Sequence, residues 1–444
     1  MQTQRDHVHA HQFQMARMSS ALLLGDPSMA DNPMRRTVLG LGAGVMVAVL
    51  VVVCFGIYGW IVPGGNDSWR TARAILVEKE TGDRYVYAGE RLHPVIDPAA
   101  ARIVSGGPSV RLVSRSSLAG VPRGAPIGIP GAPQLLPTGP EDVLSGPWLV
   151  CLGDAGRLGV NLDPSAPATE LPPDRFMLVS GGADDDYLIW RGHRHRISDK
   201  RIPVALGATN AVAVTAPPRW LTMVPAGDDL EVPSLPGDGR TIVTIDGRRA
   251  TVGALFTQAA AQGREQLFVL RADGLAPINR TMFQIVQATS GTRAVTLSAA
   301  AVAAAPRSAD RTLWEPFAEL STSTPAGLPG SVLCQRQSPT PDGGIDVRVV
   351  LTSREFAAGA PGGGAALRPG AGMVVQPVPR TRGAAADLVL IGGRGERFGL
   401  PDADANRALG LTAAPVVPFP RDLLLDLPSG PALTRAAVVA ESDR

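Results

Sequence analysis

Hydrophobic positions are most concentrated near the start of the chain, where residues 38–62 form a run of 25 residues without a charged side chain. A helix of about 20 apolar residues crosses the hydrocarbon core of a bilayer, so this segment is long enough to span it with some tilt. Tyr58 and Trp60 lie near its far end, where amphipathic rings favour the interface between lipid and water. The pattern therefore predicts one transmembrane helix over 38–62.

Two other kinds of segment have a similar apolar pattern. A cleaved signal peptide has a shorter apolar region, of about 7–15 residues, followed by a site of small residues. Here the segment ends in Trp60-Ile61-Val62-Pro63, which does not fit such a site. A buried core helix is the second alternative, and the length and abrupt edges of this segment argue against it.

The basic residues beside this segment indicate its orientation. Arg35 and Arg36 flank the N-terminal end directly, whereas the first basic residue beyond the other end is Arg70. The positive-inside rule then favours a cytoplasmic N-terminus. We expect a single-pass plasma-membrane protein with residues 1–37 as a cytoplasmic tail and the remainder outside the cytoplasm.

The tail itself has apolar residues at roughly helical spacing, namely Phe13, Met15, Met18, Leu22 and Leu23. This spacing predicts an amphipathic helix. Such a helix beside a membrane span either lies on the bilayer or contacts a partner helix. A surface helix without a partner is the alternative.

After the span, four stretches share one order of a strand, a glycine turn, a second strand and a short helix. The two strands of each stretch are predicted at 74–78 and 84–87, 187–190 and 196–197, 267–270 and 276–278, and 388–391 and 397–401. Asp97 followed by Pro98 marks the start of the helix in the first copy. The spacing between copies is irregular, which excludes a solenoid of fixed period, and chance resemblance among short strands is the alternative. The predicted repeat domains are 63–110, 176–215, 263–305 and 381–415.

The segments between these copies have other patterns. Residues 111–175 are expected to connect the first two copies and contain Cys151. A central β-rich domain is predicted from 216–262, which contains a hairpin pattern, and from 306–380, which contains Cys334. Residues 416–444 form a proline-rich tail, expected to lie extended. The predicted fold class is a single N-terminal transmembrane helix followed by a large, elongated extracytoplasmic α+β region.

Charge and cysteine content limit the function. The formal net charge is only +2, so no strong field attracts the chain to nucleic acid. Cys54 lies in the predicted span, whereas Cys151 and Cys334 lie in the region expected to be oxidising. These two cysteines can pair across more than 180 residues, and two buried free thiols are the alternative.

Two common catalytic motifs are absent from the sequence. A P-loop needs a glycine directly before its lysine, but Lys79 follows Glu78 and Lys200 follows Asp199, and these are the two lysines of the chain. The G-x-S-x-G pattern of a serine nucleophile is also missing. We expect no catalytic, cofactor-binding or metal-binding residues.

Three polar stretches contain side chains that can bind an ion or a polymer, and each also has a simpler interpretation. The alternating histidines from His7 to His11 can bind metal, although a polar stretch of the tail is the simpler interpretation. His193 and His195 share one face of a strand beside Arg191, Arg194 and Arg196, which suits an anionic wall polymer, a partner or a solvated face. Residues 184–186 are three aspartates that suit calcium or a solvated turn.

The motifs along the whole chain resemble the EccB family of actinobacterial type VII (ESX) secretion systems. Leu-His-Pro-Val and Gly-Ala-Pro segments, in order behind one early span, are specific in combination. The residues that carry the resemblance are His11-x-Phe13, Arg17-Met18, Pro33-x-Arg35-Arg36, Leu92-His93-Pro94-Val95, Pro122-Arg123-Gly124, Gly128-Ile129-Pro130-Gly131-Ala132-Pro133, Trp148, Cys151, Cys334 and Pro428-Ser429-Gly430-Pro431.

The resemblance implies four repeat domains around a central domain, linked by a disulfide, with repeats similar to a phage lysin subunit that binds cell wall. It also implies assembly with an EccC-type motor ATPase of the FtsK/SpoIIIE class and an EccD-type many-span channel subunit. An EccE subunit and a mycosin protease are further expected partners, together with self-association. Some family members carry an ATPase label, and the missing P-loop puts that label in doubt for this chain.

We therefore expect a structural subunit of the secretion complex that forms its extracytoplasmic part. Gly40, Gly44 and Ala48 recur at four-residue spacing in the span and predict a small-residue face for helix packing. A peptidoglycan-binding anchor is the alternative function, and a nucleotide hydrolase is a third.

Overall fold

The protein is represented by a computed structural model, which describes most of the chain. The described residues are 4–24, 35–61, 67–153, 156–163, 165–182, 185–237, 239, 242–259, 265–327, 329–359, 364–380 and 388–440. The chain divides into two compact units, each described by itself below. Unit 1 comprises Met1–Ala72, Glu78–Gly82 and Leu112–Val121, and unit 2 comprises Arg73–Val77, Asp83–Arg111 and Pro122–Arg444.

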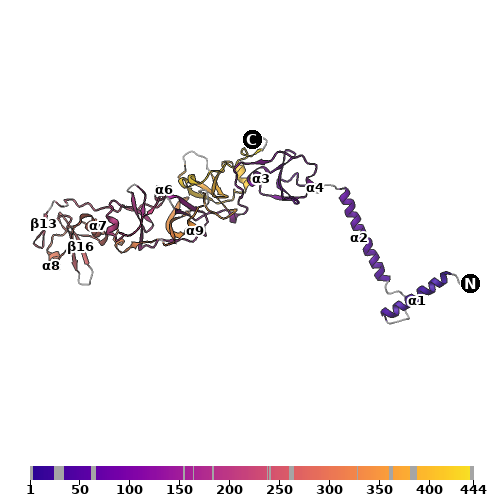
Figure 1. The fold of residues 1–444 in the computed structure, drawn as a ribbon, viewed down its shortest axis with the longest axis horizontal. Helices are drawn as coiled ribbons and strands as arrows, with labels where there is room; N and C mark the ends of the chain where they lie inside the picture. The colour runs from indigo at the N-terminus through magenta and orange to yellow at the C-terminus, as the bar shows by residue number, and fades with distance from the viewer. Residues whose placement is uncertain are drawn as a thin grey trace. The chain divides into compact units, whose positions relative to one another are not determined.

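Two long helices belong to unit 1, α1 (Gln4–Leu24) and α2 (Arg35–Ile61) (Figure 1). The part of α2 from Thr37 to Gly59 has a mean hydropathy of 2.8, and none of it is buried within the molecule. A helix satisfies all its interior backbone hydrogen bonds internally, which is the condition for crossing lipid. The predicted span is thus a helix long and apolar enough to cross a membrane, and Val62 lies outside the described residues.

Four sheets have the same strand order, in which the third, second, first and fourth strands of the sheet lie side by side. We number them sheets 1 to 4. Sheet 1 contains β1 (Ile75–Glu78), β2 (Arg84–Ala88), β3 (Arg91–Pro94) and β4 (Val110–Val113). Sheet 2 contains β9 (Arg175–Ser180), β10 (Asp186–Trp190), β11 (His193–Arg196) and β12 (Val214–Thr215), and β19 (Thr324–Pro325) also pairs with β9.

Sheets 3 and 4 complete this set. Sheet 3 contains β15 (Leu255–Ala259), β16 (Glu265–Arg271), β17 (Gly274–Pro277) and β18 (Val295–Thr296). Sheet 4 contains β22 (Gly372–Val378), β23 (Val389–Gly392), β24 (Glu396–Gly399) and β25 (Val416–Pro420). In sheets 2, 3 and 4 the fourth strand runs parallel to the first, so a crossover joins the third strand to the fourth.

A helix lies between the third and fourth strands of each sheet, namely α3 (Pro98–Ser105), α5 (Ile202–Ala205), α7 (Arg280–Ser290) and α10 (Ala403–Leu409). Three of them begin with an Asp or Asn whose side chain accepts a backbone N–H, and end at a left-handed glycine. The Asp97 cap and Pro98 start are confirmed in α3. The capping pairs are Asp97 and Gly106, Asn279 and Gly291, and Asp402 and Gly410.

A five-stranded sheet, which we call the central sheet, joins distant parts of unit 2. Its order is β7-β6-β20-β21-β8. The long hairpin of β20 (Ser331–Pro339) and β21 (Ile345–Ser353) lies beside strands from an earlier part of the chain. Those earlier strands are β6 (Trp148–Leu152), β7 (Leu158–Asn161) and β8 (Thr169–Glu170).

Shared hydrophobic cores show which sheets of unit 2 are neighbours. One core combines side chains of the central sheet with those of sheets 2 and 4, including Trp148, Val179 and Phe419. A second joins sheets 2 and 3, and a third joins α3 to sheet 4. Burial of this kind stabilises by about 25 cal/mol per Å² of apolar surface. The central sheet is therefore held between sheets 2 and 4 by continuous packing.

The remaining elements are short. The helices are α4 (Arg115–Leu118), α6 (Pro218–Met223), α8 (Ala299–Ala304), α9 (Arg354–Ala357) and α11 (Arg421–Asp426), with 3-10 turns η1 (Pro140–Asp142) and η3 (Leu320–Thr322). The strands are the hairpin β13 (Ile242–Ile245) and β14 (Arg248–Thr251), and the pair β5 (Ile127–Gly128) and β26 (Val439–Ala440).

Several predicted boundaries differ from the observed sheets. The boundaries at 263 and 381 fall between the first and second strands of sheets 3 and 4. The hairpin predicted for the central domain within 216–262 packs instead with the core of sheet 3. The central sheet takes its other strands from 111–175. The hairpin within 216–262 therefore contributes to the core of sheet 3, and a hairpin pattern in sequence does not reveal which core it joins.

The predicted extended tail from Val416 onwards begins as a sheet strand. Strand β25 pairs in parallel with β22, and α11 follows it directly. Pro418 and Pro420 fit this strand because β25 is at the edge of sheet 4, where a missing N–H costs little. The proline content alone therefore does not predict the strand with which this segment begins.

Candidate functional site

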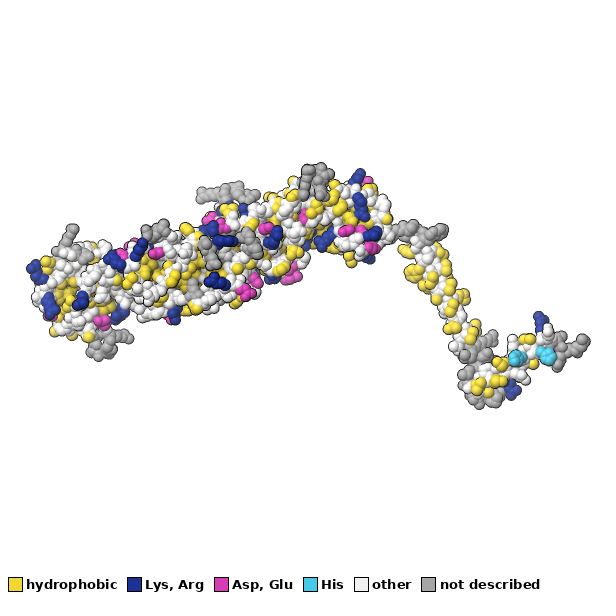
Figure 2. Space-filling model, in the orientation of Figure 1, with side chains coloured by type: hydrophobic (Ala, Val, Ile, Leu, Met, Phe, Trp, Pro, Cys, Tyr) yellow, Lys and Arg dark blue, Asp and Glu magenta, His cyan; other side chains and the backbone are white. Residues whose placement is uncertain are grey.

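The surface of α2 is apolar, and its described side chains are exposed (Figure 2). Gly40, Gly44 and Ala48 lie four residues apart and therefore on one side of the helix. A Cβ atom built on Gly40 or Gly44 meets nothing within 4 Å. That side offers a flat surface on which another helix backbone can approach closely.

Helix α1 also exposes apolar side chains, but they do not form a single stripe. Met15, Met18 and Leu22 follow each other at spacings of three and four and share one side. Phe13 stands about 200° around the helix from Met15, because each residue turns the helix by about 100°. The exposed stripe therefore consists of Met15, Met18 and Leu22.

A disulfide lies in the central sheet. The sulfur atoms of Cys151 and Cys334 are 2.10 Å apart, and the two residues are directly opposite each other on β6 and β20. Both are fully buried, in a small cluster with Leu149 and Val350. Cys54 is a free thiol on the exposed surface of α2. The bond thus links two strands that are 183 residues apart in sequence.

A buried chain of polar side chains runs beside this disulfide. The indole N–H of Trp148 donates to Gln337 at 2.9 Å, and the Gln337 amide donates to Gln335 at 2.9 Å. Gln335 donates in turn to the carbonyl of Trp220 at 2.6 Å, and the Trp220 indole donates to the Val150 carbonyl at 3.0 Å. This network was not predicted from the sequence, although two glutamines two residues apart, on one face of a strand, indicate such a buried polar pair.

A second recurring arrangement follows each of the four sheets. A residue on the third strand bridges in parallel to the residue after a proline. In each case the strand N–H donates to the proline carbonyl, and the residue two after the proline donates back to the strand. The bridged pairs are Leu92 and Arg123, Arg194 and Ala226, Leu275 and Arg307, and Arg397 and Ser429.

In three of these bridges an aromatic ring packs on a glycine. A Cβ atom on Gly124 or Gly227 would lie 2.3 Å from a histidine ring, that of His93 or His195 respectively. On Gly430 it would lie 2.1 Å from the Phe398 ring. Only glycine allows a ring this close to the backbone. Sheet 3 differs, with Ala276 and Ser308 at the two corresponding positions.

The basic strand β11 is largely occupied by partners within the chain. His195 is buried, its Nδ1 lies 2.8 Å from the Asp228 carbonyl, and burial lowers its pKa below the ordinary value. Arg196 pairs with Asp185 at 3.2 Å, and Arg191 pairs with Glu319. His193 is exposed, so the predicted common face of the two histidines is only partly available to a polymer.

Metal ligands do not gather in the described part of the chain, where no three His, Cys, Asp or Glu side chains are placed to hold an ion. Asp184, part of the candidate calcium site, lies outside the described residues. His7, His9 and His11 are exposed on α1, and Lys79 and Lys200 are exposed at surface positions.

Within the described residues one apolar helix is long enough to span a membrane, and a β-rich region closed by a disulfide follows it. This arrangement is that of a single-span membrane protein with a large folded region. The whole chain, residues 1–444, matches the family model described as type VII secretion system ESX-1, transport TM domain B. The chain therefore belongs to this family, whose members are named EccB.

Named relatives agree with this assignment. The ESX-3 secretion system ATPase EccB3 of Mycolicibacterium smegmatis is 29% identical over 491 residues, covering 99% of this chain and 90% of the relative. The ESX-5 secretion system ATPase EccB5 of Mycobacterium marinum is 30% identical over 306 residues, covering 64% of this chain and 58% of the relative. The word ATPase is part of these names, whereas a P-loop lysine motif is absent from this sequence.

Solved structures show the same fold. The EccB3 dimer from the ESX-3 core complex is similar with a TM-score of 0.57 and 29% identity, over 83% of this chain and 100% of that one. The periplasmic assembly from the ESX-5 inner membrane complex is similar with a TM-score of 0.62, over 87% of this chain and 99% of that one. Its identity of 24% supports the fold alone.

Proposed function

We propose that this chain is a structural subunit of a type VII secretion inner-membrane complex and forms part of its extracytoplasmic region. The observation that carries the proposal is the exposed apolar helix α2, joined to a large folded region in a chain that matches the family along its whole length. In this arrangement α2 crosses the plasma membrane once, with α1 in the cytoplasm. Arg35 and Arg36 at the N-terminal end of α2 support that orientation.

The extracytoplasmic region is proposed to contain four divergent copies of one unit, which are sheets 1 to 4. Their common strand order supports this reading. So does the pair of backbone hydrogen bonds that each third strand makes with a following proline segment. Each unit would then run from its first strand to that proline segment. The central sheet, closed by its disulfide, shares one core with sheets 2 and 4 and would hold these two copies together.

Assembly is proposed to occur with a motor ATPase, a many-span channel subunit and further copies of this chain. The exposed side of α2 formed by Gly40, Gly44 and Ala48 supports helix packing within the membrane. The stripe of Met15, Met18 and Leu22 on α1 is a second surface for such contacts. Self-association follows the relative whose structure is described as a dimer.

The test is an affinity purification of the tagged full-length protein from membranes in mild detergent, read by mass spectrometry. We expect the motor ATPase and the many-span subunit to co-purify. Gly44→Leu should lower their yield, because the new side chain separates the helices. Gly42→Leu is the matched control, since Gly42 is equally open but lies about 200° away around the helix.

Two outcomes would contradict the proposal. Recovery of the protein alone, with α2 intact, would make it an independent anchor, and sedimentation with purified cell wall would then be measured. An unchanged yield with Gly44→Leu would remove the glycine side of α2 from the interface but leave the subunit role in place. The two results therefore separate the function from its geometry.

A further inference from the structure

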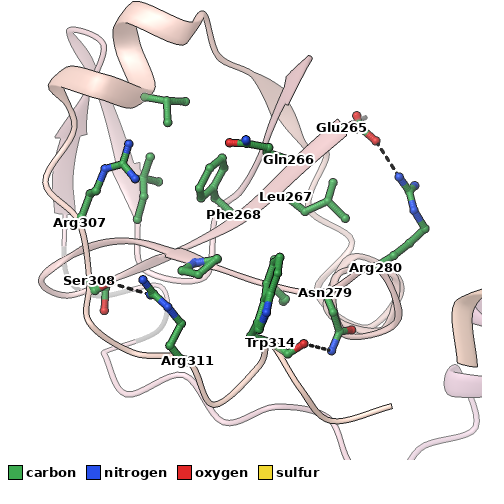
Figure 3. Close-up of a pocket in the computed structure, with 14 residues that line it drawn as sticks. Glu265, Gln266, Leu267, Phe268, Asn279, Arg280, Arg307, Ser308, Arg311 and Trp314 are labelled. Carbon is green, nitrogen blue, oxygen red and sulfur yellow. Dashed lines mark hydrogen bonds and ion pairs between the residues drawn. The ribbon is translucent and has the colours of Figure 1, made fainter. Parts of the chain in front are cut away.

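A cavity of about 770 Å³ lies in the region of sheet 3, between strands β16 and β17 and the segment from Arg307 to Trp314 (Figure 3). Its lining includes three buried apolar side chains, Phe268, Leu275 and Ile278. A cavity of this size with an apolar lining is typical of a ligand site rather than a packing defect.

Arginines surround the opening of this cavity. Arg280, Arg307 and Arg311 are exposed and line it, together with Trp314, which is 51% exposed (Figure 3). Arg280 pairs with Glu265 at 3.3 Å, and Arg311 donates to the Ser308 and Asp310 carbonyls. Arg307 makes no hydrogen bond or ion pair with the described residues. The opening therefore has an excess of positive charge and an arginine available for a ligand.

Hydrogen bonds and an ion pair hold the segment from Arg307 to Trp314 in place. Buried Arg271 pairs with Asp310 at 2.9 Å. The Asp310 carboxylate accepts the Thr312 N–H at 2.8 Å, and hydrogen bonds from Thr312 lower its pKa. Asn279 donates to the carbonyls of Trp314 and Pro316 at 3.0 and 2.7 Å. The walls are thus ordered before any ligand binds, which reduces the entropic cost of binding.

Sheet 1 has an arginine at the same position, but there its guanidinium packs on an aromatic ring. Arg123 follows the bridging proline there, as Arg307 does in sheet 3. The Arg123 guanidinium lies 4.4 Å from the centre of the Tyr85 ring. Tyr85 and Phe268 are equivalent, because each is opposite a proline on the third strand. The arginine of sheet 1 is therefore satisfied within its own sheet, whereas the arginine of sheet 3 faces an open cavity.

We propose that this cavity binds an acidic peptide segment of a partner protein, with an apolar side chain on the floor and carboxylates on Arg307 and Arg311. A carboxylate matches the two-pronged geometry of a guanidinium. The buried floor of Phe268 and Leu275 takes an aliphatic or aromatic side chain, which an anionic polysaccharide does not supply. Tryptophan and arginine are also the side chains that dominate binding at protein interfaces. This inference goes beyond the scaffold function and does not depend on it.

The first experiment selects peptides from a random hexapeptide library displayed on beads, using the full-length protein in detergent. We expect enrichment of sequences with an acidic residue beside an aromatic or aliphatic one. The best of these peptides is then labelled with fluorescein, and its dissociation constant is measured by fluorescence anisotropy. Replacement of its acidic residues by Gln, or of its apolar residue by Ala, should weaken binding about tenfold or more.

Variants of the protein locate the site. Arg307→Ala should weaken peptide binding about tenfold, because it removes a charge-assisted hydrogen bond. Arg123→Ala is the matched control and should leave it within about twofold. Thermal unfolding should be unchanged in Arg307→Ala, because this exposed side chain makes no hydrogen bond or ion pair with the described residues. Binding should also weaken as salt rises.

Three results would overturn the inference. The first is a library without enrichment, and the second is peptide binding that is insensitive to Arg307→Ala. The third is binding of polygalacturonate, lost in Arg307→Ala, while the selected peptide does not bind, which would assign the cavity to an anionic polysaccharide. None of these results bears on co-purification with the motor ATPase, so failure here is distinguishable from failure of the scaffold function.

Discussion

Removing the bond between Cys151 and Cys334 has a large predicted effect, because the bond closes a very long loop. The two cysteines are 183 residues apart. In the chain-entropy model, cross-linking a loop of this length stabilises the folded state by about 5 kcal/mol. Both side chains are fully buried, so the variant Cys151→Ala with Cys334→Ala also loses a small amount of packing. We expect the free energy of unfolding to fall by about 5 kcal/mol.

The assay is guanidinium unfolding of the full-length protein in detergent, followed by tryptophan fluorescence. Trp148 and Trp220 are fully buried beside the central sheet, so their emission reports the loss of this region. Cys54→Ser is the control, because this thiol lies on the exposed surface of α2 and should leave the midpoint unchanged.

The reasoning fails if the double variant unfolds at the same denaturant concentration as the unaltered protein. That result would mean that the unfolded chain keeps strands β6 and β20 close without the bond, so that no loop entropy is gained. A fall in stability with an unchanged slope of the transition would support the loop-closure account, because the surface exposed on unfolding would be the same.

Three further predictions follow from buried contacts. Gly430→Ala should lower the free energy of unfolding by about 1–3 kcal/mol, since the new Cβ would lie 2.1 Å from a ring carbon; Gly107→Ala, which meets nothing within 4 Å, should be tolerated in the same denaturant titration. Gln337→Leu should cost about 1–3 kcal/mol in chemical denaturation because it leaves the Trp148 N–H unpaired, and an unchanged midpoint would contradict this. Burial lowers the pKa of His195 below 6.5, so the stability that the neutral ring contributes is complete above the ordinary pKa and is lost as pH falls through the lowered pKa. His195→Phe should reduce this loss of stability in urea midpoints measured from neutral to mildly acidic pH. An equal loss in the variant would refute the prediction.

The repeated sheets show how far sequence patterns reach. The strands predicted in the second, third and fourth copies are the second and third strands of their sheets. Those predicted in the first copy are instead β1 and β2. The first strands of the other copies, β9, β15 and β22, were not identified. These strands are largely buried, and a strand covered on both faces lacks the alternation of polar and apolar residues that identifies one.

The bridges between the third strands and the proline segments show a related limit of prediction from sequence. The residue after each of these prolines lies 31 or 32 residues beyond its bridging partner, as from Leu92 to Arg123 and from Arg397 to Ser429. A constant spacing of this kind is visible in sequence once the partners are known. It was missed because proline and glycine are frequent throughout the chain, at 40 and 50 residues, so that no single Pro-x-Gly triplet stands out.

By itself the sequence determined the features that depend on neighbouring residues. The uncharged run of 38–62 predicts a helix long and apolar enough to cross a bilayer, and Asp97 with Pro98 begins α3, because bilayer thickness and capping act over one short segment. Only the tertiary structure decided that Cys151 lies opposite Cys334 and that Arg307 faces an open cavity. Those contacts join residues far apart in the chain, and long-range pairing leaves no local pattern from which it can be read.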